Sequence, residues 1–214
     1  MLVKSAYTGV AASLIAGKTT HTVASLSLNH GGKLSPQAKR RLQAFWKDKT
    51  YLIIDEYSML SKSFLARLSR NISIGKQGCS SERTGFSFGG VNVILCGDLH
   101  QFPPVARNYE EHLFRPTNLS KDSIDCQIGR SIYEEFSTVV VLHKQMRITD
   151  PTWHHTLCNL RRGQMRRQDL DVLRQLIIGR GRSGEEDFAH DPWINASLVT
   201  PRHSVRNLWN ESSS

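Results

Sequence analysis

Short apolar runs rich in β-branched residues recur along the chain. They are almost continuously apolar rather than alternating with polar positions, which is typical of parallel strands covered on both faces. The pattern predicts three clear strands, a short one at the start and another near the end: Tyr51–Ile54, Val91–Cys96, Thr138–Leu142, Leu2–Ala6 and Ala196–Val199. Because Cys96 closes one of these apolar runs, we expect its side chain in the core.

Helical patterns lie between the strands. Ser35 directly before Pro36 is a typical N-cap with proline in the first turn, and it predicts a helix over Pro36–Lys47. The spacing of apolar positions predicts further helices at Thr8–Ala16, Ser58–Ile72, Trp153–Arg162 and Asp169–Ile177. Two remaining segments are predicted as long loops, Ile74–Gly90 and Pro103–Gln127.

This alternation of strands and helices predicts the α/β class, with a parallel sheet, right-handed crossovers and helices on both faces. The 214 residues suffice for one domain and part of a second. No apolar run approaches the roughly 20 residues that span a bilayer, and the first residues lack a secretory signal. We therefore expect an intracellular protein without a membrane partner.

The charge balance adds a candidate partner. The chain holds 28 basic and 19 acidic residues, a net charge of +9, which favours a phosphate-rich partner such as a nucleic acid. The excess gathers at Lys33–Lys49 and Arg161–Arg174. The first of these runs also fits a solvated helix face, the commoner role of such a sequence.

Candidate chemistry follows the predicted strands. Asp55 and Glu56 come after the first clear strand, Gln101 lies in the segment after the second, and Arg147 follows the third. Ligands of open parallel sheets bind beyond the carboxyl ends of the strands, so we expect these side chains at one edge. This set suits nucleotide hydrolysis, in which an aspartate holds Mg²⁺, the next acid polarises water, an amide orients it and an arginine stabilises the phosphoryl group.

Each of these residues has a structural alternative. An acidic pair after a strand also serves as a helix cap with a favourable dipole interaction, and an arginine in a loop is usually a surface residue. The shared strand context and the shared edge favour the catalytic interpretation.

Four segments resemble the motifs of one helicase family. YLIIDEYSML resembles the DEAD-type box of superfamily-one helicases, and FGGVNVILCGDLHQFPPV resembles motif III of their Pif/RecD-like branch. AYTGVAASLIAGKTTHTVASL resembles motif Ia of that branch, and LHKQMRITDPTWHHTLCNLRRGQ resembles motif IV with the helix after it. The resemblance runs from residue 2 to about residue 209, with GDLHQFPPV as its most specific part, and it extends to the Pif-like helicase regions of Helitron transposons.

The resemblance implies a RecA-like P-loop NTPase fold and ATP-dependent, 5′ to 3′ unwinding of DNA, with ATP and Mg²⁺ as cofactors. Residues 1–150 correspond to a first motor domain, and residues 151–214 to a helical connector and the beginning of a second. The implied partners are single-stranded DNA and duplex junctions. The implied roles are DNA repair, recombination and telomere maintenance, in the nucleus of a eukaryote or in its mitochondria.

The resemblance also assigns roles to individual residues. Asp55 corresponds to the Mg²⁺ ligand, Glu56 to the catalytic base, Gln101 to the γ-phosphate sensor and Arg147 to the arginine finger. Contacts with single-stranded DNA are implied for Thr8, Gly9, His21, Phe102 and Pro103. Phe102 is the candidate for base stacking, and its structural alternative is packing beside the two prolines that follow it.

The glycine-rich phosphate loop of such a motor precedes motif Ia, where this chain begins. We therefore expect an incomplete copy, which leaves a non-catalytic DNA-binding remnant as the alternative function. Ala12–Thr19 approximates a phosphate loop with alanine in place of the first glycine, and would support a small nucleotide kinase. The helix predicted over Thr8–Ala16 argues against that interpretation, because a helix cannot wrap a phosphate.

Overall fold

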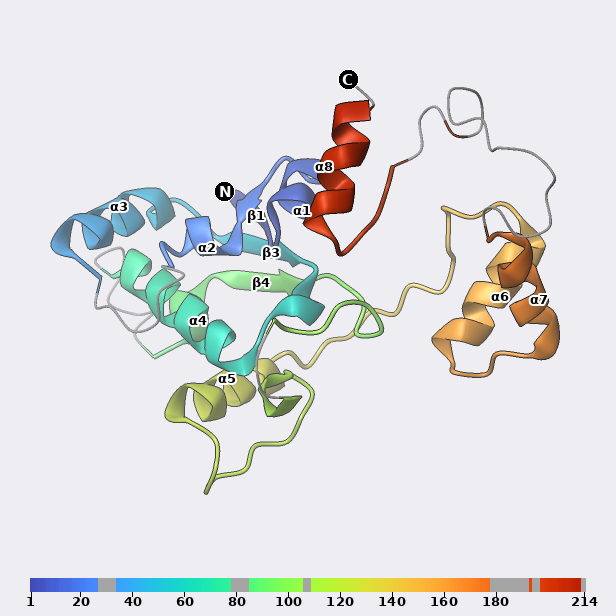
Figure 1. Ribbon diagram of the computed structural model, residues 1–214. Coiled ribbons are helices and arrows are strands. Elements are labelled where there is room, and N and C mark those ends of the chain that lie inside the picture. The colour runs from blue at the N-terminus through green and yellow to red at the C-terminus, as the bar shows by residue number, and fades with distance from the viewer. Residues whose placement is uncertain (27–33, 78–84, 106–108, 178–192, 194–196, 213–214) are drawn as a thin grey trace. The chain divides into compact units, whose positions relative to one another are not determined.

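The computed structural model describes residues 1–26, 34–77, 85–105, 109–177, 193 and 197–212 (Figure 1). The chain forms two compact units, Met1–Val141 and Leu142–Ser214, and each is described by itself. Among the described residues, no helix is long and apolar enough to cross a membrane.

A parallel four-stranded sheet organises the first unit. It consists of β1 (Leu2–Ala6), β2 (Lys18–Thr19), β3 (Tyr51–Asp55) and β4 (Asn92–Leu95), in the order β2-β1-β3-β4. Leu2 lies opposite Tyr51, which in turn lies opposite Asn92, so the strands begin at one level. The α/β class and three of the predicted strands are thereby confirmed.

The core lies where β1 and β3 meet two helices, α3 (Pro36–Trp46) and α4 (Lys62–Lys76). Leu52 and Ile54 of β3 are fully buried, as is Trp46 at the end of α3. The Trp46 indole Nε1 donates a hydrogen bond to the Val23 carbonyl at 2.9 Å. Gly75 of α4 allows close packing, because an added Cβ would lie 2.7 Å from the Trp46 ring.

Local sequence explains where these helices begin. The Ser35 hydroxyl accepts a hydrogen bond from the Ala38 amide at 3.2 Å, and Ser61 caps α4 in the same way through Phe64 at 3.1 Å. Serine at this position satisfies an amide that has no partner inside the helix. The predicted helix over Ser58–Ile72 thus begins later, because a single 3-10 turn, η1 (Tyr57–Met59), precedes it.

The segment predicted as a loop over Pro103–Gln127 contains more structure than expected. It includes η4 (Tyr109–Glu111) and the start of α5 (Ile124–Glu134), which packs against α4 (Figure 1). An added Cβ at Gly129 would lie 1.8 Å from the Lys62 carbonyl oxygen, so the two helices cross at this glycine. The Lys62 side chain is fully buried beneath the crossing and pairs with Asp122 at 3.5 Å.

Further short elements complete the first unit: α1 (Gly9–Leu14), α2 (Thr20–Val23) and η3 (Ser87–Gly90). The predicted helix over Thr8–Ala16 is shorter than expected, and Ala16 already has a φ of 52°. The predicted loop over Ile74–Gly90 holds the end of α4 and η3, and its residues 78–84 lie outside the described chain.

The strand prediction for Thr138–Leu142 is wrong. The run pairs with no strand of the described sheet, and the side chains of Val139, Val140 and Leu142 are 79%, 79% and 89% exposed. An apolar, β-branched run becomes a strand only where an edge accepts its backbone hydrogen bonds. Ser197–Val199 is also not a strand, and Ala196 lies outside the described residues.

The second unit contains α6 (Pro151–Arg161), α7 (Arg167–Gln175) and α8 (His203–Ser212). Asp150 caps α6 by accepting a hydrogen bond from the Trp153 amide at 2.8 Å. At the other end Gly163 has a φ of 66°, and the Gln164 amide donates to the Asn159 carbonyl at 2.9 Å. Glycine is favoured here because the residue after the helix has a left-handed backbone conformation, which turns the chain from α6 into α7.

Candidate functional site

The predicted site residues of the first unit lie at the carboxyl edge of the sheet. Asp55 ends β3 directly opposite Ala6, the last residue of β1, and Ile54 lies opposite Leu95 at the end of β4. The parallel arrangement therefore sends three segments from the same edge: residues 7–9, 56–58 and 96–101. Ligands of open parallel sheets bind at this edge.

The acidic pair holds an unusual backbone conformation. Glu56 has φ 55° and ψ 43°, the left-handed region that side chains other than glycine adopt at a cost of about 1 kcal/mol. Its amide donates a hydrogen bond to the Asp55 Oδ1 at 3.0 Å. The next residue is tied to the neighbouring strand, because the Tyr57 amide donates to the Cys96 carbonyl at 3.1 Å. Strain of this kind concentrates at functional sites.

Gly97 allows the segments after β3 and β4 to pass close to each other. Its φ is 154°, and an added Cβ would lie 3.0 Å from both the amide nitrogen and the ring of Tyr57. The following residues form a turn in which the Gln101 amide donates to the Asp98 carbonyl at 3.0 Å. The Gln101 side chain is exposed.

The surroundings of this edge disfavour negative charge on neighbouring groups. Burial, the Tyr133 hydroxyl and the Asp98 carboxylate together raise the pKa of Tyr57 to about 12. Partial desolvation by neighbouring atoms, followed by the Asp55 carboxylate, raises the pKa of the Cys96 thiol, although the residue as a whole is exposed. Burial is the larger cause of both shifts, and the carboxylates of Asp98 and Asp55 add to it.

The prediction that Cys96 lies in the core is wrong. Its side chain is exposed, and Ile94 of the same strand is 48% exposed. β4 is the outermost strand of the described sheet, so its apolar residues have less cover than those of β3. An apolar run therefore did not imply complete burial.

The predicted DNA contacts Thr8 and Gly9 lie at the same edge, directly after β1. Thr8 is the N-cap of α1, and its hydroxyl accepts a hydrogen bond from the Ala11 amide at 3.2 Å. Gly9 is exposed, and nothing lies within 4 Å of an added Cβ. The fold alone therefore does not require glycine at this position, whereas the close approach of a ligand backbone would.

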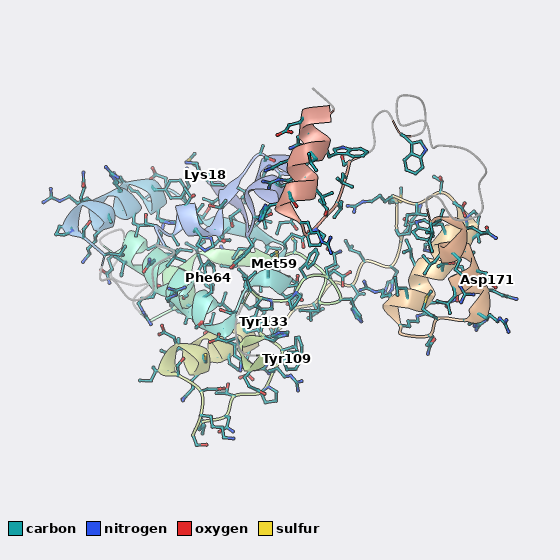
Figure 2. The ribbon with its side chains drawn as sticks, in the orientation of Figure 1. Lys18, Met59, Phe64, Tyr109, Tyr133 and Asp171 are labelled. Atoms are coloured by element: carbon teal, nitrogen blue, oxygen red, sulfur yellow. The ribbon has the colours of Figure 1, made fainter. Side chains whose placement is uncertain are left out.

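His21 is part of an aromatic cluster with Tyr7 and Phe64 (Phe64 is labelled in Figure 2). Its ring centroid lies 5.4 Å from that of Tyr7 and 4.8 Å from that of Phe64. Burial, followed by the nearby positive charge of Arg67, lowers the pKa of His21. The imidazole is therefore mostly neutral near pH 7, and it lies beside Tyr7, the residue that immediately precedes Thr8.

Phe102 and Pro103 are exposed, whereas Pro104 is buried. The Phe102 side chain is 77% exposed, so packing beside the two prolines does not account for it. Its ring is accessible to a base from solvent.

Arg147 belongs to the second unit, in a stretch without regular secondary structure. Its side chain is exposed, and its backbone amide donates a hydrogen bond to the Gln145 Oε1 at 2.9 Å. Its assignment as an arginine finger stays a prediction.

The segment Ala12–Thr19 does not have the order of a phosphate loop. It runs from α1 into the strand β2, whereas a phosphate loop runs from a strand into a helix. An added Cβ at Gly17 would lie 2.6 Å from the Lys4 carbonyl, and the Lys18 ammonium lies 5.3 Å from the Phe45 ring centroid. These contacts are structural, and they leave the kinase interpretation without support.

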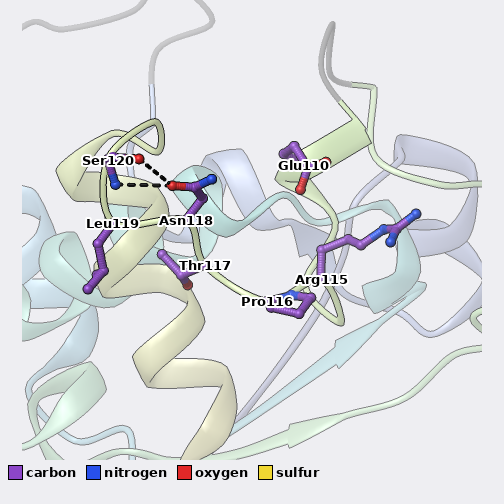
Figure 3. Close-up of a pocket in the computed structure, with 7 residues that line it drawn as sticks. All are labelled: Glu110, Arg115, Pro116, Thr117, Asn118, Leu119 and Ser120. Atoms are coloured by element: carbon purple, nitrogen blue, oxygen red, sulfur yellow. Dashed lines mark hydrogen bonds between the residues drawn. The ribbon is translucent and has the colours of Figure 1, made fainter.

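Sequence reasoning missed Tyr57 and Gly97, which fix the geometry of the edge. Their structural role comes from the close packing of the segments that follow β3 and β4, which the sequence does not show. Sequence reasoning also did not predict an open hollow of about 570 Å³ beside residues 115–120 (Figure 3). There the Ser120 amide and hydroxyl donate to the Asn118 Oδ1 at 3.1 and 2.7 Å, forming a tight turn.

Sequence comparisons identify relatives among helicases. The model of the family described as PIF1-like helicase matches residues 1–171. The ATP-dependent DNA helicase PIF1 of Danio rerio is 30% identical over 213 residues, which covers 97% of this chain and 29% of the relative. That of Xenopus laevis is 31% identical over 189 residues, covering 86% of this chain and 26% of the relative. The chain spans less than a third of the length of either relative.

Solved structures agree with this relationship. The Pif1 helicase from Bacteroides in complex with ADP-AlF3 and ssDNA matches with a TM-score of 0.59 at 25% identity, over 87% of this chain and 42% of that chain. The Pif1 helicase from Candida albicans matches with a TM-score of 0.69 at 24% identity, over 99% of this chain and 43% of that chain, which supports the fold. The family match includes the sheet, the acidic pair and most of the α6–α7 hairpin. The chain belongs to the PIF1-like helicase family.

Proposed function

We propose that this chain is part of the motor of an ATP-dependent DNA helicase that moves 5′ to 3′ along single-stranded DNA. The observation that supports the proposal is that Asp55 ends β3 level with the ends of β1 and β4, so that Glu56 and the segment with Gln101 leave the sheet at one edge. The strained conformation of Glu56 supports a catalytic role at that edge.

ATP and Mg²⁺ are the proposed cofactors. The Asp55 carboxylate at the end of β3 suits a divalent cation, which would neutralise phosphate charge when bound. Asp55 would hold the ion, Glu56 would accept the proton of the attacking water and Gln101 would orient that water. Arg147 is proposed to stabilise charge on the transferred phosphoryl group.

Single-stranded DNA and its junctions with duplex DNA are the proposed partners. The net charge of +9 and the exposed positions of Gly9, Phe102 and Pro103 support this proposal. Thr8 and His21 would lie beside these residues along the path of the bound single-stranded DNA. The related structures from Bacteroides are described as bound to ssDNA and to forked dsDNA.

The larger organisation is part of the same proposal. Residues 1–150 form the first motor domain, and residues 151–214 form a connector and the beginning of the second. A nuclear or mitochondrial location and roles in repair, recombination and telomere maintenance follow from the relationship to eukaryotic PIF1 helicases.

ATP hydrolysis by the 214-residue chain, with and without single-stranded DNA, tests the proposal. DNA-stimulated turnover that Glu56→Gln abolishes, and that Glu134→Gln, the same change on an exposed residue of α5, leaves intact, would show that the catalytic site is complete and would overturn the expectation of an incomplete copy. Turnover that survives Glu56→Gln contradicts the role of Glu56. DNA binding without any turnover favours the non-catalytic alternative.

A further inference from the structure

A second hollow of about 180 Å³ lies beside the segment that follows β4, between η1 and η4. Its buried lining residues are Ser58, Pro104 and Leu113, and Gln101 and Pro103 also contribute to it. The hollow therefore adjoins the proposed catalytic edge. None of the roles proposed for the edge residues uses it.

Three aromatic side chains, Tyr109, His112 and Phe114, form what we term the aromatic wall of this hollow (Tyr109 in Figure 2). Ring centroids lie 4.3 Å apart for Tyr109 and His112, and 5.4 Å apart for His112 and Phe114. Tyr109 and Phe114 are 53% and 42% exposed, so their rings are accessible. The Arg115 guanidinium lies 4.2 Å from the Tyr109 ring centroid and adds positive charge at the wall.

The aromatic wall is anchored to the start of α4. His112 forms an isolated β-bridge with Ser61, and the Glu111 Oε2 accepts hydrogen bonds from the Ser63 amide at 3.2 Å and hydroxyl at 2.9 Å. Burial and Arg115 lower the pKa of His112, so its ring is neutral near pH 7. The wall is thus a fixed surface of neutral rings.

Ser58 lines the hollow on its buried side. Ser58 is 5% exposed, and among the residues that the structure describes, none provides a hydrogen-bond partner for its Oγ. A buried hydroxyl without a partner is unfavourable, but this Oγ is enclosed by protein atoms and does not reach the surface of the hollow.

These features define the occupant. The volume is well below the roughly 300–1,000 Å³ of sites for drug-sized ligands, and it suits one planar ring. An aromatic wall stacks such a ring. We propose that this hollow receives one nucleobase of the bound single strand, stacked on Tyr109 and Phe114. The inference rests on the proposed DNA binding, and it adds a base-binding subsite that Phe102 alone does not provide.

Two oligonucleotides of equal length, oligo(dT) and a wholly abasic strand, separate base contacts from backbone contacts. We expect the full chain to bind oligo(dT) more tightly than the abasic strand. Tyr109→Ala and Phe114→Ala should each weaken oligo(dT) binding roughly five- to a hundredfold and leave abasic binding unchanged. The matched control is Phe86→Ala, which removes an aromatic ring that is 66% exposed and outside the hollow.

Several outcomes overturn the inference. Equal losses for both strands indicate a backbone or folding effect, and unchanged binding in both variants indicates that no base enters the hollow. Photo-cross-linking with 5-iodouracil DNA provides a second readout, with adducts expected on Tyr109, His112 or Phe114. Adducts lost on adding excess ATP, while the DNA stays bound, would assign the hollow to the base of the nucleotide instead. If neither strand binds at all, the proposed function fails as well.

Discussion

At the scale of single residues, Glu56 combines a proposed chemical role with a backbone conformation that suits glycine better. Its φ of 55° lies in the left-handed region, and hydrogen bonds on both sides hold it there. The sequence indicated the carboxylate through its position after an apolar strand. It gave no sign of the strain, because the strain comes from the crossing with the segment after β4.

Two substitutions separate these properties. Glu56→Gly and Glu56→Ala both remove the carboxylate, but only glycine adopts the left-handed region without a steric cost. We expect the glycine variant to be more stable than the alanine variant by about 1 kcal/mol, measured by urea denaturation of the full chain. Equal stability of the two variants would contradict the presence of strain.

At the scale of elements, the crossing of α4 and α5 depends on a charge buried between them. The Lys62 side chain is fully buried, pairs with Asp122 at 3.5 Å and donates to the Pro116 carbonyl at 3.3 Å. Sequence analysis predicted a loop over most of this region. A lysine and a distant aspartate carry no local signal that they will meet, so only the packed helices revealed the pair.

Removing one partner of this pair leaves the other charge buried. We expect Asp122→Asn to destabilise the first unit by about 3–5 kcal/mol. Asp125→Asn is the control, because Asp125 pairs with Arg70 at a position where both side chains are partly exposed, and we expect a loss of at most about 1 kcal/mol. Thermal unfolding of both variants provides the measurement. Similar losses of stability would show that the buried pair contributes no more than the exposed pair.

The α6–α7 hairpin depends on another acid. Asp169 accepts hydrogen bonds from the Arg166 amide at 2.8 Å, the Asn159 side-chain amide at 3.0 Å and the Thr156 hydroxyl at 3.3 Å. These bonds, the Arg166 amide first, lower the pKa of Asp169 below its usual 3.8. A lowered pKa in the folded state stabilises the fold above the unfolded value, and that contribution is lost as the pH falls through the folded value.

We therefore expect Asp169→Asn to weaken hydrogen-exchange protection of α6 and α7 near pH 6. The difference from the wild type should shrink as the pH falls below about 4. Asp171→Asn serves as the control, since Asp171 (labelled in Figure 2) is 52% exposed and pairs with Arg174 on the surface of α7. A difference that stays constant with pH would contradict a charged Asp169 in the hairpin.

At the scale of the whole molecule, the net charge of +9 predicts how single-stranded DNA binding responds to salt. We expect the logarithm of the binding constant to fall linearly with the logarithm of salt concentration, with a slope of about −0.7 for each phosphate contacted. Fluorescence titration at several salt concentrations measures the slope. An oligonucleotide with an uncharged methylphosphonate backbone is the control, and equal slopes for the two would exclude phosphate contacts.

The sequence by itself determined β1, β3 and β4, the serine caps of α3 and α4, and the acids at the end of β3. These features depend on local patterns, because helix capping and the periodicity of apolar positions are set by residues only a few positions apart. Only the tertiary structure decided that Thr138–Leu142 is not a strand, that Cys96 is exposed, and that Ser58 meets an aromatic wall some fifty residues away in the chain. Each of these depends on which other segment covers or pairs with the residue, and that partner is absent from the local sequence.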